Sequence, residues 1–173
     1  MSTLATWIAA NVPADTEQDE YRCEELSREI ASEESLWRKH VRHDEGNRFY
    51  TQLYRDPALD VWLICWTNRQ DTGYHDHDRS SGGVCVAQGA LLEDFFQRDG
   101  DGWIREKTNR HEVGGSFHFD ASYIHGVRHV GDGATSIHVY SPALWRMGHY
   151  EHDGSGIMRR VSMTYADELL GVG

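Results

Sequence analysis

Two histidines separated by one residue, His75 and His77, are the side chains of this sequence best suited to chemistry. Successive side chains of a β-strand point to opposite faces, so both imidazoles would share one face, and Asp76 and Asp78 would share the other. Two imidazoles on one rigid strand form half of a metal site, and the third ligand must come from another segment. His125 is the best candidate. We therefore predict a three-histidine metal centre.

A second stretch that could do chemistry places Ser136, His138 and Tyr140 at alternate positions, with Ile137 and Val139 between them. A polar face turned to solvent is common in antiparallel sheets, and this is the plainer interpretation. However, these three groups can also relay a proton, because a hydroxyl can fix the imidazole tautomer and the imidazole can orient a phenol. Since the stretch closely follows His125, we favour a role beside the metal.

The elements that must position these residues are mostly short strands separated by turn signals. Helices are predicted near 3–11 and over 16–40, with a break near Ser32. Strands are predicted at 49–54, 60–66, 83–88, 90–97, 102–107, 115–119, 125–130, 135–140 and 161–165.

This pattern predicts an all-β fold with a helical N-terminal cap, formed as one domain over residues 1–173. Residues 1–44 would form the cap, 45–145 the barrel core with the metal site, and 146–173 a C-terminal extension.

Composition excludes several classes of partner and compartment. The formal net charge of −11 argues against nucleic acid and against anionic membrane surfaces. Three cysteines without a CxxC pair predict neither a disulfide framework nor a structural zinc site. Residues 1–12 lack the basic start of a signal peptide, and no window is long and apolar enough to span a membrane. We expect a cytoplasmic protein that is a monomer or at most a weak dimer.

The spacing from His75 and His77 to Gly82 and then Gly89 resembles the first motif of the cupin barrels, and His125 fits the second motif loosely. The resemblance implies a single cupin, or jelly-roll-like, β-barrel. Gly82 stands where that motif has an acidic ligand, so the ligand set would be imidazole only. Such a set suits Fe(II), Zn, Cu or Ni. Another metal-dependent cupin enzyme, such as an isomerase, and a non-catalytic cupin binding module remain alternatives.

The combined pattern resembles the cysteine dioxygenase family of thiol dioxygenases over about residues 45–145. The resemblance implies a mononuclear non-haem Fe(II) held by three histidines, and oxidation of a thiol to a sulfinic acid with both atoms of O2. It also implies that the polar face of residues 136–140 assists the reaction. The matching segments are His75-x-His77, Gly89-x-Leu91-x-Glu93, His125-Gly126-Val127 and Ser136-x-His138-x-Tyr140-Ser141-Pro142.

Two departures from the family pattern narrow this interpretation. Some members, notably animal ones, have at the position of Gly82 a cysteine that is cross-linked to the tyrosine matching Tyr140, and a glycine cannot form that bond. Cysteine-specific members have an arginine for the substrate carboxylate at the position of Gln52. A glutamine cannot make the bidentate ion pair of an arginine. The chain therefore resembles a Gln-type bacterial member whose substrate is not cysteine itself.

The expected substrate is a 3-mercaptopropionate-like thiol or a thioimidazole such as ergothioneine. Gln52, Tyr50 and Trp66 are predicted to contact it. Members with the glutamine use another arginine nearer the C-terminus, for which Arg146 is the candidate. The aromatic residues would also suit a cationic thiol.

Overall fold

The computed structural model describes residues 3–67, 70–98, 100, 104–152 and 158–170. Helices α1 (Leu4–Asn11) and α2 (Glu20–Ser32) come first, followed by short 3-10 helices η1 (Glu34–Leu36) and η2 (Arg38–His40). The chain then forms β1 (Phe49–Arg55), β2 (Asp60–Trp66), β3 (Tyr74–His75), β4 (Ser81–Arg98), β5 (Ile104–His111), β6 (Ser116–Phe119), β7 (His125–Ser141), β8 (Arg146–His152), β9 (Met158–Tyr165) and helix α3 (Ala166–Leu170).

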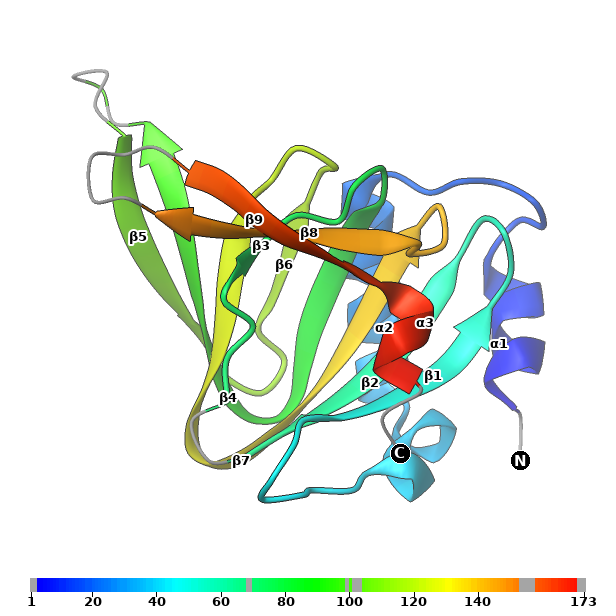
Figure 1. Cartoon of the computed structure of the whole chain (residues 1–173). Helices are drawn as coiled ribbons and strands as arrows, with labels where there is room; N and C mark the ends of the chain where they lie inside the picture. Colours follow the sequence, from blue (N-terminus) through cyan, green and yellow to red (C-terminus); the bar gives the residue numbers. More distant parts are fainter. Residues whose placement is uncertain (1–2, 68–69, 99, 101–103, 153–157, 171–173) are drawn as a thin grey trace.

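The frame of the molecule is the antiparallel pair of long strands β4 and β7, which stay paired from Ser81↔Ser141 to Phe95↔His125. The pairing shifts register near Gly89, where the strands bend. Gly89 has a φ of +73°, and a Cβ there would lie 2.1 Å from a carbonyl oxygen of β7. Only glycine allows that backbone conformation and that approach. The bend lets the sheet curve into a barrel (Figure 1).

The strand predictions locate the elements but not their continuity. The segments 83–88 and 90–97 belong to one strand, β4, and the segments 125–130 and 135–140 belong to β7. In both cases the glycines near the middle lie within a continuous, bent strand and do not end it. The strand β8 was not predicted. The first residues of the predicted strand 102–107 lie outside the described residues.

The N-terminal helices cover one face of β7, so the other face is turned to the interior of the barrel. Ile137 and Val139 pack with apolar residues of α1 and α2 in one buried cluster. Ser136, His138 and Tyr140 therefore point into the barrel, where each is at most 5% exposed. The solvent-facing interpretation of this polar face is wrong, because the helices cover its apolar side and the sheet encloses the polar one.

The β8–β9 hairpin completes the barrel on the side away from α2 (Figure 1). Its first strand pairs with β3 through His75↔His149. Asp76 lies between His75 and His77 in the sequence. It accepts hydrogen bonds from the backbone N–H of Gly148 at 3.0 Å and from Arg160 at 2.6 Å. The segment that carries two predicted metal ligands is thus tied to the hairpin. In the described part of the chain, no helix is long and apolar enough to cross a membrane.

The contact between α2 and β4 leads to a stability prediction. A Cβ on Gly83 would lie 2.2 Å from the backbone nitrogen of Glu24, which cannot move without shifting the helix. We expect Gly83→Ala to lower the free energy of unfolding by about 3 kcal/mol or more, as overpacking does. Denaturant unfolding measures the change. Gly100→Ala is the matched control, since a Cβ there meets nothing within 4 Å; equal stability losses in the two variants would contradict the prediction.

Candidate metal centre and its cavity

Three histidines meet inside the barrel. His75 lies on β3 and pairs directly with His125 at the start of β7, and His77 follows two residues later on the same side as His75. One nitrogen from each ring lies within 4.8 Å of the others. All three residues are buried, with at most 5% exposure. The predicted ligands thus lie together, although the strand ends at His75 and the following residues turn, with a φ of +56° at Asp78.

The hydrogen bonds of two rings leave a definite nitrogen free. The Nδ1 of His75 lies 3.1 Å from the carbonyl oxygen of Gly73, and the Nδ1 of His125 lies 3.1 Å from the Oε1 of Glu93. Both oxygens are acceptors, so each Nδ1 carries the proton and each Nε2 keeps its lone pair. His77 is held by stacking on Phe119, with ring centroids 4.1 Å apart.

Burial makes these imidazoles suitable donors. Burial, followed by the charges of neighbouring histidines, lowers the pKa of His75 and of His77 well below the ordinary value. Both rings are therefore neutral near pH 7, which is the form that binds a metal. A buried set of three imidazole nitrogens fits a first-row transition metal such as Fe(II), Zn, Cu or Ni.

A hydrogen-bond chain runs along the interior face of β7. Trp66 donates from Nε1 to the Oγ of Ser136 at 2.9 Å, and this oxygen lies 2.8 Å from the Nε2 of His138. The Nδ1 of His138 lies 3.2 Å from the hydroxyl oxygen of Tyr140. Because Trp66 can only donate, the Ser136 proton is available to His138, which then donates from Nδ1 to Tyr140. The Tyr140 proton is left for a group in the cavity.

The protonation states of this chain are well defined. Burial, with smaller effects of His125 and Arg48, lowers the pKa of His138 to about 3. Burial, with the nearby Asp60 and Tyr50, raises the pKa of Tyr140 above its ordinary value. At neutral pH the imidazole is therefore uncharged and the phenol keeps its proton, so the chain presents a hydrogen-bond donor to the cavity.

The three histidines line one cavity of about 160 Å³ together with Trp66, His138 and Tyr140 of this hydrogen-bond chain. It is smaller than the roughly 300–1,000 Å³ of drug-sized ligand sites, which favours a small ligand. The described residues that line it are Arg48, Tyr50, Trp62, Ile64, Trp66, Thr72, His75, His77, Val84, Phe119, His125, Val127, His138, Tyr140, Leu144, Met147, His149, Thr164 and Leu169.

The predicted substrate residues divide into two groups. Tyr50 and Trp66 line the cavity, whereas Gln52 and Arg146 are not among its described lining residues. Gln52 donates from Nε2 to the Oδ1 of Asp60 at 3.0 Å. A substrate contact by Gln52 stays a prediction.

Arg146 pairs with Asp78 at 3.2 Å, and its guanidinium lies 4.4 Å from the ring centroid of Trp145. It thus faces the outer side of the histidine segment. A substrate contact by Arg146 likewise stays a prediction.

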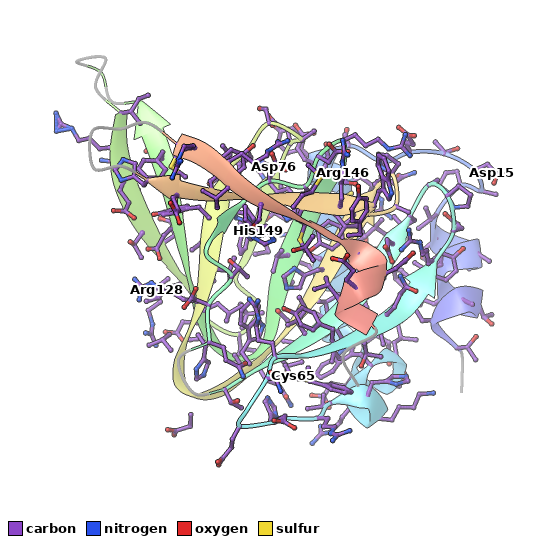
Figure 2. All side chains as sticks on the ribbon, viewed as in Figure 1. Asp15, Cys65, Asp76, Arg128, Arg146 and His149 are labelled. Carbon is purple, nitrogen blue, oxygen red and sulfur yellow. The ribbon has the colours of Figure 1, made fainter. Side chains whose placement is uncertain are left out.

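Arg48 and His149 are polar residues of the cavity that were not predicted from the sequence. Arg48 stacks 5.5 Å from the ring centroid of Tyr50 and 5.3 Å from that of Trp66, and its Nη1 is buried without a hydrogen-bond partner among the described residues. Its position two residues before Tyr50 was a usable signal, because strand alternation places both on one face. His149 lies beneath β8 toward the barrel interior (Figure 2), and no motif marks it.

Gly82 is enclosed by aromatic side chains. It pairs with Tyr140 across β4 and β7, and a Cβ at this position would lie 2.4 Å from the ring of Phe119. The ring that stacks on His77 thus fills the space that a side chain at residue 82 would need.

Comparison with known proteins places the chain in a family. A family model described as cysteine dioxygenase type I matches residues 8–153. The chain belongs to the cysteine dioxygenase type I family. The family match confirms the resemblance stated from the sequence. Together with this match, the cluster of three histidines in the chain is a candidate non-haem metal site. No curated protein matches the chain.

Solved structures show the fold of this cysteine dioxygenase family member. TT1209 from Thermus thermophilus is 15% identical, with a TM-score of 0.52 over 61% of this chain and 93% of that one. A cupin superfamily protein from Desulfitobacterium hafniense DCB-2 is 8% identical, with a TM-score of 0.51 over 61% of this chain and 86% of that one. KdgF from Halomonas sp. is 19% identical, with a TM-score of 0.50 over 62% of this chain and 92% of that one. The predicted cupin barrel is confirmed.

The buried neutral His138 predicts a specific pH dependence of stability. Its folded pKa of about 3 lies below the unfolded value, so the unfolded chain binds the extra proton first and stability falls as pH drops below about 6.5. Between pH 7.5 and pH 5 this residue alone should cost about 2 kcal/mol. We expect His138→Gln to remove that part of the decrease in metal-free protein, as measured by urea unfolding at both pH values. An unchanged difference between the two pH values would contradict the assignment.

Proposed function

We propose that this protein is a thiol dioxygenase that oxidises a small thiol to its sulfinic acid with O2 and a mononuclear non-haem Fe(II). His75, His77 and His125 would hold the iron. The observation that carries the proposal is that three buried imidazoles face the same small cavity as His138 and Tyr140, which are hydrogen-bonded to each other, in a cysteine dioxygenase family member. When bound, Fe(II) would supply a site for the thiolate sulfur and the electrons that activate O2.

Tyr140 would orient the reacting groups from the wall of the cavity. Its hydroxyl accepts from His138 and retains its own proton, so it can donate a hydrogen bond to substrate or O2. Ser136 and Trp66 hold the His138 ring from behind. This fixed geometry would let Tyr140 donate without reorganisation during the reaction.

The aromatic walls would keep water out. Trp62, Trp66 and Phe119 line the cavity and are each at most 2% exposed. Excluding water protects reactive oxygen chemistry from side reactions and strengthens the polar contacts that remain.

The charge of the cavity favours a thiol that carries a carboxylate. Arg48 brings a guanidinium with a free donor nitrogen to the site. The same guanidinium occupies the faces of Tyr50 and Trp66, which a quaternary ammonium would otherwise use. Of the two expected substrates, a 3-mercaptopropionate-like thiol therefore fits better than ergothioneine. Gln52 stands where cysteine-specific members have an arginine, and Arg48 would supply the positive charge for the substrate carboxylate in its place.

The isomerase alternative has less support than the dioxygenase. It would need an extra carboxylate near the site, and among the described residues the group able to hold a metal contains the three histidines alone.

Oxygen uptake by iron-loaded protein tests the proposed function. We expect uptake with 3-mercaptopropionate and a product heavier by two oxygen atoms in mass spectrometry, with weaker uptake for cysteine, cysteamine and ergothioneine. His77→Ala should lose both bound iron and uptake. Iron-loaded protein that consumes no O2 with any of the four thiols would refute the proposal and favour a binding module.

The role of Arg48 gives a separate prediction. Arg48→Gln should lower kcat/KM for 3-mercaptopropionate by about 10–100-fold, the value of a lost hydrogen bond to a charged group. Uptake with the cationic thiol cysteamine should not fall, because that substrate gains nothing from the guanidinium. Arg146→Gln is the matched control, since Arg146 pairs with Asp78 outside the described cavity lining. The same loss for both thiols in the Arg48 variant would count against charge selection.

A further inference from the structure

We infer that Glu93 is a positioning residue of the metal centre, which fixes the ring of His125 and supplies a negative charge that the imidazole-only ligand set lacks. The inference rests on the metal site of the proposed function, but not on its reaction. Glu93 lies on β4, which pairs directly with the start of β7, where His125 lies. It is 2% exposed.

Three donors immobilise the carboxylate. The Nδ1–H of His125 donates to Oε1 at 3.1 Å, and the hydroxyl of Tyr123 donates to the same oxygen at 3.3 Å. The Nε2–H of His111, on β5, donates to Oε2 at 3.1 Å. A buried carboxylate requires such partners, and with both oxygens engaged it cannot rotate away from His125.

The carboxylate also selects the tautomer of His125. An ionised carboxylate only accepts hydrogen bonds, so the His125 proton must be on Nδ1 and the lone pair on Nε2. Among the three histidines, His75 has a backbone carbonyl at its Nδ1, and the Nδ1 of His77 has no partner among the described residues. His125 is therefore the ligand with an anionic partner.

This placement has an electrostatic consequence. Three neutral imidazoles leave the full charge of a divalent ion uncompensated, whereas a carboxylate hydrogen-bonded to one ligand makes that ring a stronger base and a better donor. The effect is larger in a buried site than in water, because the surroundings screen it less. Glu93 itself is not a ligand, since its oxygens are occupied by His125, Tyr123 and His111, and it is outside the described lining of the cavity.

Metal binding by Glu93→Gln tests the inference, because the amide keeps the shape and an acceptor oxygen but removes the charge. We expect the affinity of the metal-free protein for Zn(II), measured by competition with a chromophoric chelator, to fall about 10–100-fold. The reduction potential of the bound iron should rise, because a nearby negative charge that stabilises the ferric form is lost.

His111→Phe is the matched control for the variant. It removes the outer hydrogen bond of Glu93 but leaves the charge and the bond to His125, so Zn(II) affinity should change far less than in Glu93→Gln. A folded Glu93→Gln protein with wild-type Zn(II) affinity and wild-type potential would overturn the inference and leave Glu93 a packing residue.

A measurement on the unmodified chain covers the case in which Glu93→Gln does not fold. In metal-free protein with ¹⁵N-labelled histidine, NMR should show His125 as the Nδ1–H tautomer; an Nε2–H tautomer would overturn the inference. Zn(II) affinity, potential and tautomer are measured without a thiol. A protein that fails to oxidise thiols therefore leaves these results interpretable, and a failed Glu93 test leaves the oxygenase proposal standing.

Discussion

The ladder between β4 and β7 is the constraint on which the site depends. It sets Gly82 opposite Tyr140 and Val84 opposite His138, and it brings Glu93 beside the start of β7, where His125 lies. A shift of one residue would turn every side chain of β7 to its other face. The register is specified because both faces of residues 134–141 of β7 are buried against different partners, the helices on one side and the cavity on the other.

The site combines an apolar enclosure with polar groups that have little contact with water. Neutral imidazoles and an un-ionised phenol can be buried there because each has defined neighbours, and the aromatic walls supply the packing around them. The overall charge of the chain is −11, yet the cavity carries a guanidinium. The charged residue that lines the cavity is therefore opposite in sign to the net charge of the whole molecule.

The sequence alone was sufficient for those parts of the site that follow from local periodicity. Alternation in a strand placed His75 with His77, and Ser136 with His138 and Tyr140, before any long-range contact was known. Residues that meet only through distant pairing were not predictable in this way. His149 comes opposite His75 because β8 pairs with β3, and the continuity of β4 depends on a bend at Gly89 that also resembles a turn signal.

The link between Asp76 and the β8–β9 hairpin joins segments that are far apart along the chain. The segment that carries His75 and His77 lies near the middle of the chain, but its outer face is held by Gly148 and Arg160. During synthesis these partners leave the ribosome long after the two histidines do. In the finished fold, two of the three predicted metal ligands are therefore held in place through Asp76 by residues that follow it by 72 and 84 positions along the chain.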